Sequence, residues 1–335
     1  MARRPVSDHA LLADVGGTNV RFALADPAAE VPLLDASIRP YAVADFPSLA
    51  AAAGHYLESI DAHVGHGVFA VAGRVEHGQA RLTNHPWVVS APQIAQALGL
   101  RALQLVNDFV AQAMSVRLLR EGDVQAVGPG IAPGQSVVDR TYAIVGPGTG
   151  LGVGALLLRD GRATALATEA GHVGFAPGNA QEIAILECLA AHYGHVSNER
   201  LVSGGGLVNL HRALAAIAGG PWDESIQPAD ITARAQAGDE RCVEVVELFC
   251  GIFGSVAGDM ALALGAWDGV YLTGGLVPHL LEDLQRPAFR EHFEAKGRYA
   301  EAMARVPTLA IMHPQPGLLG AAAIACDLAR EHASR

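Results

Sequence analysis

An α/β protein with two lobes is predicted from two features of the sequence. The chain has 335 residues, and a single hydrophobic core usually stops growing below that length. Segments with strand-like and helix-like apolar patterns alternate along the first half, which is typical of α/β proteins. A stretch rich in Gly and Pro at 121–140 shows little periodicity, so we expect the lobe boundary near it.

The expected elements follow one another in a simple order. In the first half they are a hairpin of strands at 10–15 and 20–25, a helix at 47–61, a strand at 67–72, a helix at 91–98, a strand at 102–106 and a helix at 108–119. In the second half they are strand, glycine turn and strand over 141–161, closed by an Asp160-Gly161 hairpin turn, then helices at 180–193, 206–217 and 239–265, a strand at 269–273 and a helix at 317–330. Each half opens with a strand, a Gly-Thr turn and a strand, which indicates an internal duplication.

Composition and charge argue against several classes of partner. The 34 acidic residues outnumber the 23 basic ones, and the net charge of -11 disfavours nucleic acid and anionic membranes. Glycines and charges interrupt the apolar stretches, and the first residues lack the apolar core of a signal peptide, so we expect a cytoplasmic protein with no membrane contact. The cysteines form no CxxC pair, so we expect buried apolar side chains rather than a zinc site or disulfides at Cys188, Cys242, Cys250 and Cys326.

Lys296 is the only lysine in the sequence, and Gly297 follows it. A Walker A loop requires a lysine followed by Ser or Thr, so P-loop chemistry is excluded. A catalytic lysine elsewhere in the chain is excluded for the same reason. Any bound phosphate must therefore be held by backbone amides.

The first glycine turn, Gly16-Gly17-Thr18-Asn19, closely follows Asp14 near the end of a strand. Glycines let backbone N–H groups approach an anion, and Thr18 and Asn19 add neutral donors, so the turn suits phosphate oxygens. Asp14 is placed to hold Mg²⁺, through water, which would offset the phosphate charge. A plain hairpin turn is the alternative for this motif.

The second glycine turn, at 146–150, contains Gly148 and Thr149 and would cradle another part of a polyphosphate. Gly150, Gly152 and Ala155 also match the spacing of a dinucleotide fingerprint. That fingerprint requires a helix to begin at the glycines, whereas the residues that follow have the pattern of a strand, which disfavours the dinucleotide alternative.

A third glycine pair, Gly274-Gly275, ends an expected strand and precedes an expected helix. A nucleotide can pack on bare backbone at such a place, and a structural strand-to-helix turn is the alternative.

Asn107 and Asp108 stand where an expected strand ends and an expected helix begins. Either residue can serve as a helix N-cap. A carboxylate near a helix N-terminus is also stabilised in its charged form, and it can accept a proton from an attacking hydroxyl.

Glu169, His172 and Glu199 lie beside further glycines. A metal site would need a third ligand at matching spacing to Glu169 and His172, which the sequence lacks. A neutral, polyhydroxylated ligand fits better, because carboxylates accept hydrogen bonds from adjacent hydroxyls and imidazole both donates and accepts.

Taken in order, several segments of the chain resemble the bacterial glucokinase family. They are ADVGGTN, VND, GPGTGLG, TEAGHVGFAP, NERLVSGGGL, LTGGLVP and HPQPGLLGAAA. They span nearly the whole chain, and their number and order make the resemblance specific. The chain lacks the cysteine-rich zinc motif of the ROK sugar kinases, so it is identified as a member of the zinc-free, non-ROK group.

The resemblance implies the two-lobed, actin-like ATPase (ribonuclease H-like) sugar kinase fold, with a duplicated core and an active site in the interlobe cleft. The C-terminal helix of this family returns to the first lobe. The expected lobes are therefore 1–118 with 315–335, a small α/β lobe, and 119–314, a large α/β lobe.

The resemblance also implies roles for the residues singled out above. The expected ligands of the ATP phosphates and of Mg²⁺ are Asp14, Gly16, Gly17, Thr18 and Asn19, with Gly148 and Thr149 as a second phosphate loop and Gly274 and Gly275 beside the adenosine. The expected ligands of glucose are Asn107, Asp108, Glu169, His172 and Glu199, with Asp108 as the base toward the 6-hydroxyl. The family further suggests a homodimer. Two departures occur, TEAGH for TEGGH and SGGGL for SGPGL, and neither removes a polar group.

Three other functions are weighed against glucose phosphorylation. A kinase for another hexose or an amino sugar of the same fold would need the same motifs. A sugar-responsive transcription regulator would need a DNA-binding domain, for which the first strand near residue 10 leaves no room. An actin-like filament protein would need ATP but not the cluster of Asn, Asp, Glu and His.

Overall fold

The computed structural model describes residues 7–82, 87–129, 139–220 and 225–333. The chain forms two compact units, Met1–Arg120 with His313–Arg335 and Glu121–Met312. These boundaries lie within two residues of 118 and 315, where the lobes were expected to end and to resume. Part of the expected boundary stretch, 130–138, lies outside the described residues.

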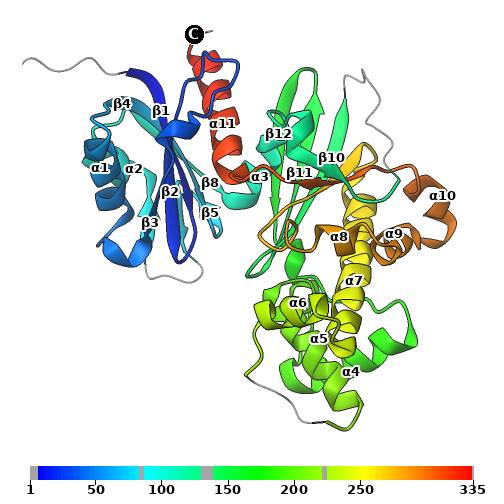
Figure 1. Ribbon diagram of the computed structural model, residues 1–335. Coiled ribbons are helices and arrows are strands. Elements are labelled where there is room, and N and C mark those ends of the chain that lie inside the picture. The colour runs from blue at the N-terminus through cyan, green and yellow to red at the C-terminus, as the bar shows by residue number, and fades with distance from the viewer. Residues whose placement is uncertain (1–6, 83–86, 130–138, 221–224, 334–335) are drawn as a thin grey trace, which may run out of the picture. The chain divides into compact units, whose positions relative to one another are not determined.

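The first unit contains a five-stranded sheet in the order β3-β2-β1-β4-β8 (Figure 1). Its strands are β1 (Ser7–Val15), β2 (Asn19–Ala25), β3 (Arg39–Ala42), β4 (Val64–Val71) and β8 (Ala102–Asn107). β2 pairs antiparallel with β1 and β3, whereas β4 pairs parallel with β1 and β8. β1 and β4 are covered on both faces, which explains their nearly continuous apolar sequences.

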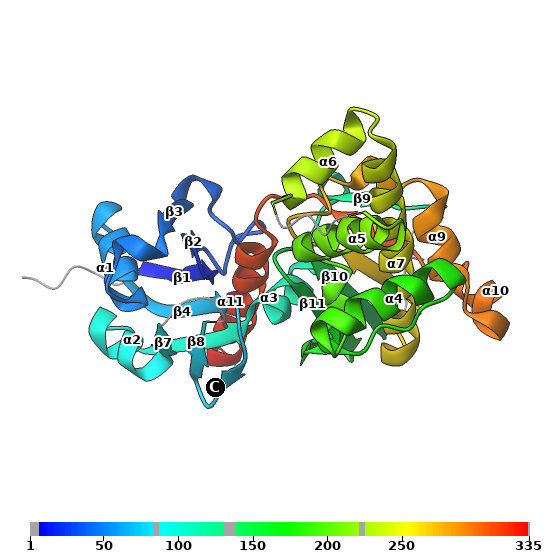
Figure 2. The same ribbon diagram turned by 90° about the horizontal axis from the view of Figure 1, so that it is seen from below.

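Helices cover both faces of this first sheet. They are α1 (Leu49–Ser59), α2 (Ala91–Leu98), α3 (Asp108–Ser115) and α11 (Pro316–Ala333). α1 and α2 bury a core with one face of the sheet, where Phe22 stacks on Tyr56 with ring centroids 5.4 Å apart. α11 packs against β1, β4 and α3 on the other face (Figures 1 and 2). The last helix of the chain thus belongs to the first unit.

α3 and α11 are held together at two points. A side chain on Gly320 would overlap the carbonyl oxygen of Ala111, so only glycine permits this close approach. Further along, the guanidinium of Arg117 donates two hydrogen bonds to the carboxylate of Asp327, at 2.5 and 3.0 Å. α11 therefore fixes the position of α3.

The second unit repeats the same sheet topology. Its strand order is β12-β11-β10-β13-β14-β9. The strands are β10 (Arg140–Pro147), β11 (Leu151–Arg159), β12 (Arg162–Thr168), β13 (Gly269–Leu272), β14 (Thr308–Ile311) and β9 (Val124–Ala126). β11 pairs antiparallel with β10 and β12, and β13 pairs parallel with β10 and β14, as in the first unit. The first five strands in this order match the first sheet one by one, which confirms the predicted duplication.

The helices of the second unit gather around one long helix, α7. They are α4 (Ala180–Tyr193), α5 (Gly204–Ile217), α6 (Pro228–Gln236), α7 (Glu240–Leu264), α8 (Leu281–Leu284), α9 (Pro287–Glu294) and α10 (Ala300–Met303). α7 packs against α5, α6, α9 and β10. Its 25 residues are long and apolar enough to cross a membrane, contrary to the expectation from sequence, but 72% of its most apolar window is buried inside the protein. Such burial is typical of a core helix.

Lys296 anchors the segment after α9 to α7. Its Nζ lies 2.7 Å from Oδ1 of Asp259 and donates hydrogen bonds to the carbonyl and hydroxyl oxygens of Ser255. The side chain is 10% exposed. The single lysine is therefore a structural residue.

Some elements differ from the sequence-based expectations. β3, β9, β14, α6, α9 and a small sheet of β5 (Val75–Glu76), β6 (Gln79–Arg81) and β7 (Val88–Ser90) were not expected. These elements are short, and Pro40 interrupts the strand pattern of β3. The Asp160-Gly161 hairpin turn is confirmed, since both residues have positive φ. The cysteines are free thiols; Cys242, Cys250 and Cys326 are buried and Cys188 is half-buried.

Candidate active site

In the first unit, the candidate residues lie at one edge of the sheet. The register pairs Val15 of β1 with Val71 of β4, and Val71 with Asn107 of β8. The carboxyl ends of these three parallel strands therefore coincide, and ligands of open α/β sheets bind at such ends. The first glycine turn follows the end of β1, and the Asn107-Asp108 pair lies at the end of β8.

The first glycine turn is a tight connection between β1 and β2. The N–H of Gly16 donates to the carbonyl of Asn19 at 2.9 Å, and the carbonyl of Thr18 accepts from the N–H of Val43 at 2.9 Å. Thr18 and Asn19 are exposed. The motif is thus a hairpin turn in shape, with two polar residues available to a ligand.

Asp14 lies one residue before the end of β1 and is half-buried. Burial raises the pKa of its carboxyl above the usual value, and the guanidinium of Arg21, 3.8 Å away, opposes this shift. A cation bound near Asp14 would stabilise the ionised form that burial disfavours.

The donor set around Asp14 fits Mg²⁺. No group of three or more His, Cys, Asp or Glu in the described ranges could enclose a metal ion. Mg²⁺ does not require such a cage, because it usually keeps several waters and binds one or two carboxylates together with substrate phosphates. A single carboxylate beside a glycine turn meets that requirement.

Asn107 caps helix α3. Its Oδ1 accepts hydrogen bonds from the N–H groups of Phe109 and Val110, at 2.9 and 3.3 Å, and its Nδ2 donates to the carbonyl of Gly73 at 3.1 Å. The N-cap alternative is therefore confirmed for Asn107. Asp108 begins the helix, and its Oδ1 accepts from the N–H of Phe109 at 3.0 Å.

In the second unit, the second and third glycine motifs lie against each other. A side chain on Gly274 would overlap the carbonyl oxygen of Pro147, and the N–H of Leu276 donates to that same oxygen at 3.2 Å. The carbonyl of Gly148 accepts from the N–H of Gly204, the first residue of α5, at 2.9 Å. Two glycine turns and a helix start therefore share one edge of the sheet.

Two expectations about these motifs are corrected or settled by the structure. Gly274-Gly275 is not followed directly by a helix, because Gly274 has a φ of 89° and a turn brings the N–H of Val277 to its carbonyl; α8 begins only at Leu281. The dinucleotide alternative is excluded, since β11 rather than a helix follows Gly150.

Glu199 connects the candidate sugar ligands to the second glycine turn. Its Oε2 accepts a hydrogen bond of 2.9 Å from the N–H of Leu151, and its Oε1 lies 3.9 Å from Nδ1 of His172. A side chain on Gly171 would overlap the carbonyl oxygen of Leu151, so the turn that carries His172 packs directly on the start of β11. Glu169 is exposed and immediately precedes this turn. The structure thus brings His172, Glu199 and the second glycine turn together.

The two departures from the family motifs have a simple structural explanation. Ala170 packs against the core, whereas Gly171, which the chain retains, has no room for a side chain. Gly205 is exposed in the first turn of α5, where proline and glycine are both tolerated. Gly206, which is also retained, would collide with the carbonyl of Leu201 if it had a side chain.

A hollow of about 440 Å³ adjoins the segment after Gly274-Gly275. α6, α7 and the residues before and within α8 form its walls. Its lining residues are Thr232, Ala235, Gln236, Val243, Val246, Pro278, His279, Leu280, Leu281, Glu282, Asp283 and Arg286. Half of these twelve residues are polar or charged, among them Glu282, Asp283 and Arg286.

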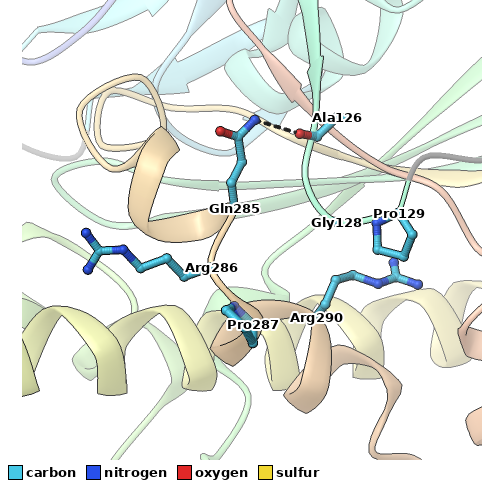
Figure 3. Close-up of a pocket in the computed structure, with 7 residues that line it drawn as sticks. All are labelled: Ala126, Gly128, Pro129, Gln285, Arg286, Pro287 and Arg290. Atoms are coloured by element: carbon cyan, nitrogen blue, oxygen red, sulfur yellow. Dashed lines mark hydrogen bonds between the residues drawn. The ribbon is translucent and has the colours of Figure 1, made fainter.

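A second hollow, of about 470 Å³, lies between β9 and α9 (Figure 3). Its polar groups are engaged with the protein itself. Gln285 donates to the carbonyl of Ala126 at 2.9 Å, Arg286 pairs with Asp283, and Arg290 is bonded to Glu294 and to backbone carbonyls. These contacts support the fold, and we assign this hollow no role in binding.

Several glycines that shape the site were not singled out from the sequence. Gly171 lies against Leu151, Gly73 accepts from Asn107, and Gly317 lies against Asp14. Only Gly73 carried a local signal, a glycine just after a strand. The others depend on contacts between segments far apart in the sequence.

The repeated five-stranded sheet, with a glycine turn after its central strand in each unit, is that of the actin-like sugar kinases. The glucokinase family model matches residues 11–328. The chain belongs to the glucokinase family.

Relatives and solved structures agree with this assignment. The chain is 56% identical over 326 residues to a glucokinase of Stenotrophomonas maltophilia strain K279a, covering 97% of each chain. It is 57% identical over 327 residues to a glucokinase of Xanthomonas euvesicatoria pv. vesicatoria, covering 96% of each. A crystal structure of a glucokinase from an Antarctic psychrotroph aligns with a TM-score of 0.85 at 33% identity, covering 96% of this chain and 99% of that one.

Proposed function

We propose that this chain transfers the γ-phosphoryl group of ATP to the 6-hydroxyl of glucose, giving glucose 6-phosphate for glycolysis. The observation that carries the proposal is the hydrogen bond between Glu199 and the N–H of Leu151, which joins a candidate sugar ligand to a candidate phosphate turn. Phosphoryl transfer depends mainly on positioning and charge neutralisation. This hydrogen bond would help to hold the sugar in position relative to the phosphates.

The proposed sugar ligands are Asn107, Asp108, Glu169, His172 and Glu199. Asp108 orients the 6-hydroxyl and takes its proton as the new O–P bond forms and the terminal P–O bond of ATP breaks. Its place in the first turn of α3 supports this role, because the helix N-terminus stabilises the carboxylate that must receive the proton. Asn107, which is held by its own cap bonds, presents Asp108 in a fixed position.

The proposed phosphate ligands are the two glycine turns, Gly16 to Asn19 and Gly148 with Thr149. Since the only lysine is bound to Asp259, no free lysine supplies donors, and the backbone amides of these turns would do so together with Thr18 and Asn19. Asp14 would hold Mg²⁺ through water, and the ion would supply charge neutralisation at the phosphates.

We further propose that the adenosine lies beside Gly274 and Gly275, with its base in the hollow of about 440 Å³. What supports this is the position of that hollow next to Pro278 and the apolar side chains among its lining residues, such as Val243 and Leu280, on which a flat ring could pack. Thr232 and Gln236 are among its polar lining residues.

A coupled assay with ATP, Mg²⁺ and a panel of hexoses tests the proposed reaction. We expect the highest kcat/KM for glucose. A higher value for another hexose or for an amino sugar would favour the alternative kinase of the same fold. Light scattering with ATP separates both from a filament protein, which would assemble without sugar. Cytoplasmic location and a homodimer also belong to this proposal.

A further inference from the structure

Gly317, in the first turn of α11, lies directly against the carboxylate of Asp14. A Cβ built on Gly317 would stand 2.9 Å from both Cγ and Oδ2 of Asp14 and 3.1 Å from Oδ1. Real Cβ atoms almost never approach other atoms below 3.0 Å. The bare backbone at residue 317 therefore leaves the room that the Asp14 carboxylate occupies.

Two facts make this contact specific to Asp14. The three nearest atoms outside α11's own backbone all belong to the end of the Asp14 side chain, which can rotate. Gly317 also does not have a positive φ, so alanine can adopt its backbone conformation. A methyl group at this position would consequently move the carboxylate while leaving the fold intact.

Gly320, one turn further along the same helix, provides the contrast. A Cβ there would overlap the carbonyl oxygen of Ala111, a backbone atom of α3 that cannot step aside. Gly320 thus serves helix packing. Gly54 in α1 provides a neutral comparison, because its Cβ would lie 3.6 Å from Leu98, an ordinary contact.

We propose that Gly317 is a positioning residue for the nucleotide-bound metal: the last helix of the chain, by lacking a side chain at this point, sets where the Asp14 carboxylate presents its oxygens. This inference rests on the proposed role of Asp14. Substitution of a residue that orients a metal ligand typically costs about 10- to 100-fold in metal affinity or activity.

Three glycine variants of the full chain test the proposal: Gly317→Ala, Gly320→Ala and Gly54→Ala. Binding of ADP is measured by calorimetry with Mg²⁺ and, separately, with EDTA, glucose binding is measured alone, and the melting temperature is recorded. For Gly317→Ala we expect an unchanged or higher melting temperature and unchanged glucose binding. The affinity for Mg²⁺-ADP should fall about tenfold or more, with little change in EDTA. Gly320→Ala should melt at a lower temperature, and Gly54→Ala should bind Mg²⁺-ADP as the wild type does.

The variant Asp14→Asn separates this proposal from the function on which it rests. If Asp14→Asn binds Mg²⁺-ADP as tightly as the wild type, the role of Asp14 is wrong and the inference falls with it. If Asp14→Asn weakens binding but Gly317→Ala does not, only the inference about Gly317 is overturned. A fall in melting temperature for Gly317→Ala as large as that for Gly320→Ala would also overturn it, because it would show a packing role instead.

Discussion

The carboxylate of Glu199 accepts a hydrogen bond of 2.9 Å from the backbone N–H of Leu151, the residue that follows the second glycine turn. Gly150 makes this contact possible, since a side chain there would overlap Oε2 of Glu199. A displacement of the second glycine turn should therefore also displace the carboxylate of Glu199, and a displacement of Glu199 should move the turn.

Gly150→Ala should displace Glu199, a proposed ligand of the sugar, although residue 150 itself lies in the second glycine turn. The added methyl group forces Glu199 aside, and loss of its hydrogen bond to the sugar should raise the KM for glucose about tenfold or more. Steady-state kinetics with varied glucose provide the measurement. Gly122→Ala, which places its methyl group in open space, is the matched control. An unchanged KM would show that Glu199 does not contact the sugar.

Asp108→Asn should remove the proton acceptor while keeping the shape of the side chain. We expect kcat to fall by at least about 10²-fold, with a much smaller change in the dissociation constant for glucose. Rapid-quench measurements and direct glucose titration separate the two effects. Turnover close to that of the wild type would refute the role of Asp108 as base.

Asp14→Asn should stabilise the ligand-free protein at neutral pH. Because burial raises the pKa of Asp14, the folded state holds the proton more tightly than the unfolded chain does. When the pH is above the raised pKa, the ionised Asp14 carboxylate lowers the free energy of unfolding of the wild type. This destabilisation disappears as the pH falls below the ordinary pKa of 3.8. The variant should therefore melt at a higher temperature than the wild type at pH 7, with the difference shrinking toward pH 4.

Melting curves of both proteins across this pH range provide that measurement. Asp45→Asn, which changes an exposed carboxylate, serves as the control. A gain that is equally large at acidic pH would contradict the explanation based on ionisation.

Ala235→Trp should fill the hollow proposed for the adenine base. Ala235 lines the hollow, and a tryptophan there takes up the space that the base would use. We expect the KM for ATP to rise while the KM for glucose stays the same. Ala233→Trp on the same helix is exposed and does not line the hollow, so it should leave both constants unchanged. Equal effects of the two substitutions would argue against this site for adenosine.

Local patterns predicted the paired strands and their glycine turns well, because a turn and its flanking strands are specified by neighbouring residues. The hairpin at Asp160-Gly161 and the repeated opening of each half are examples. β14 and α9 were missed, and their structure depends on burial within the unit. The sequence identified Glu199 and Asp14, but their partners Leu151 and Gly317 could not be found, because they come from distant segments. The proposed roles of these residues stay predictions until the variants are measured.

The ion pair between Lys296 and Asp259 has a practical consequence for handling this protein. Reagents that acylate amines find one lysine in the whole sequence, and its nitrogen is already engaged by a carboxylate and a carbonyl oxygen. Amine coupling at lysine is therefore a poor way to attach a dye or a solid support, whereas the same treatment should spare the glycine turns and the carboxylates around them.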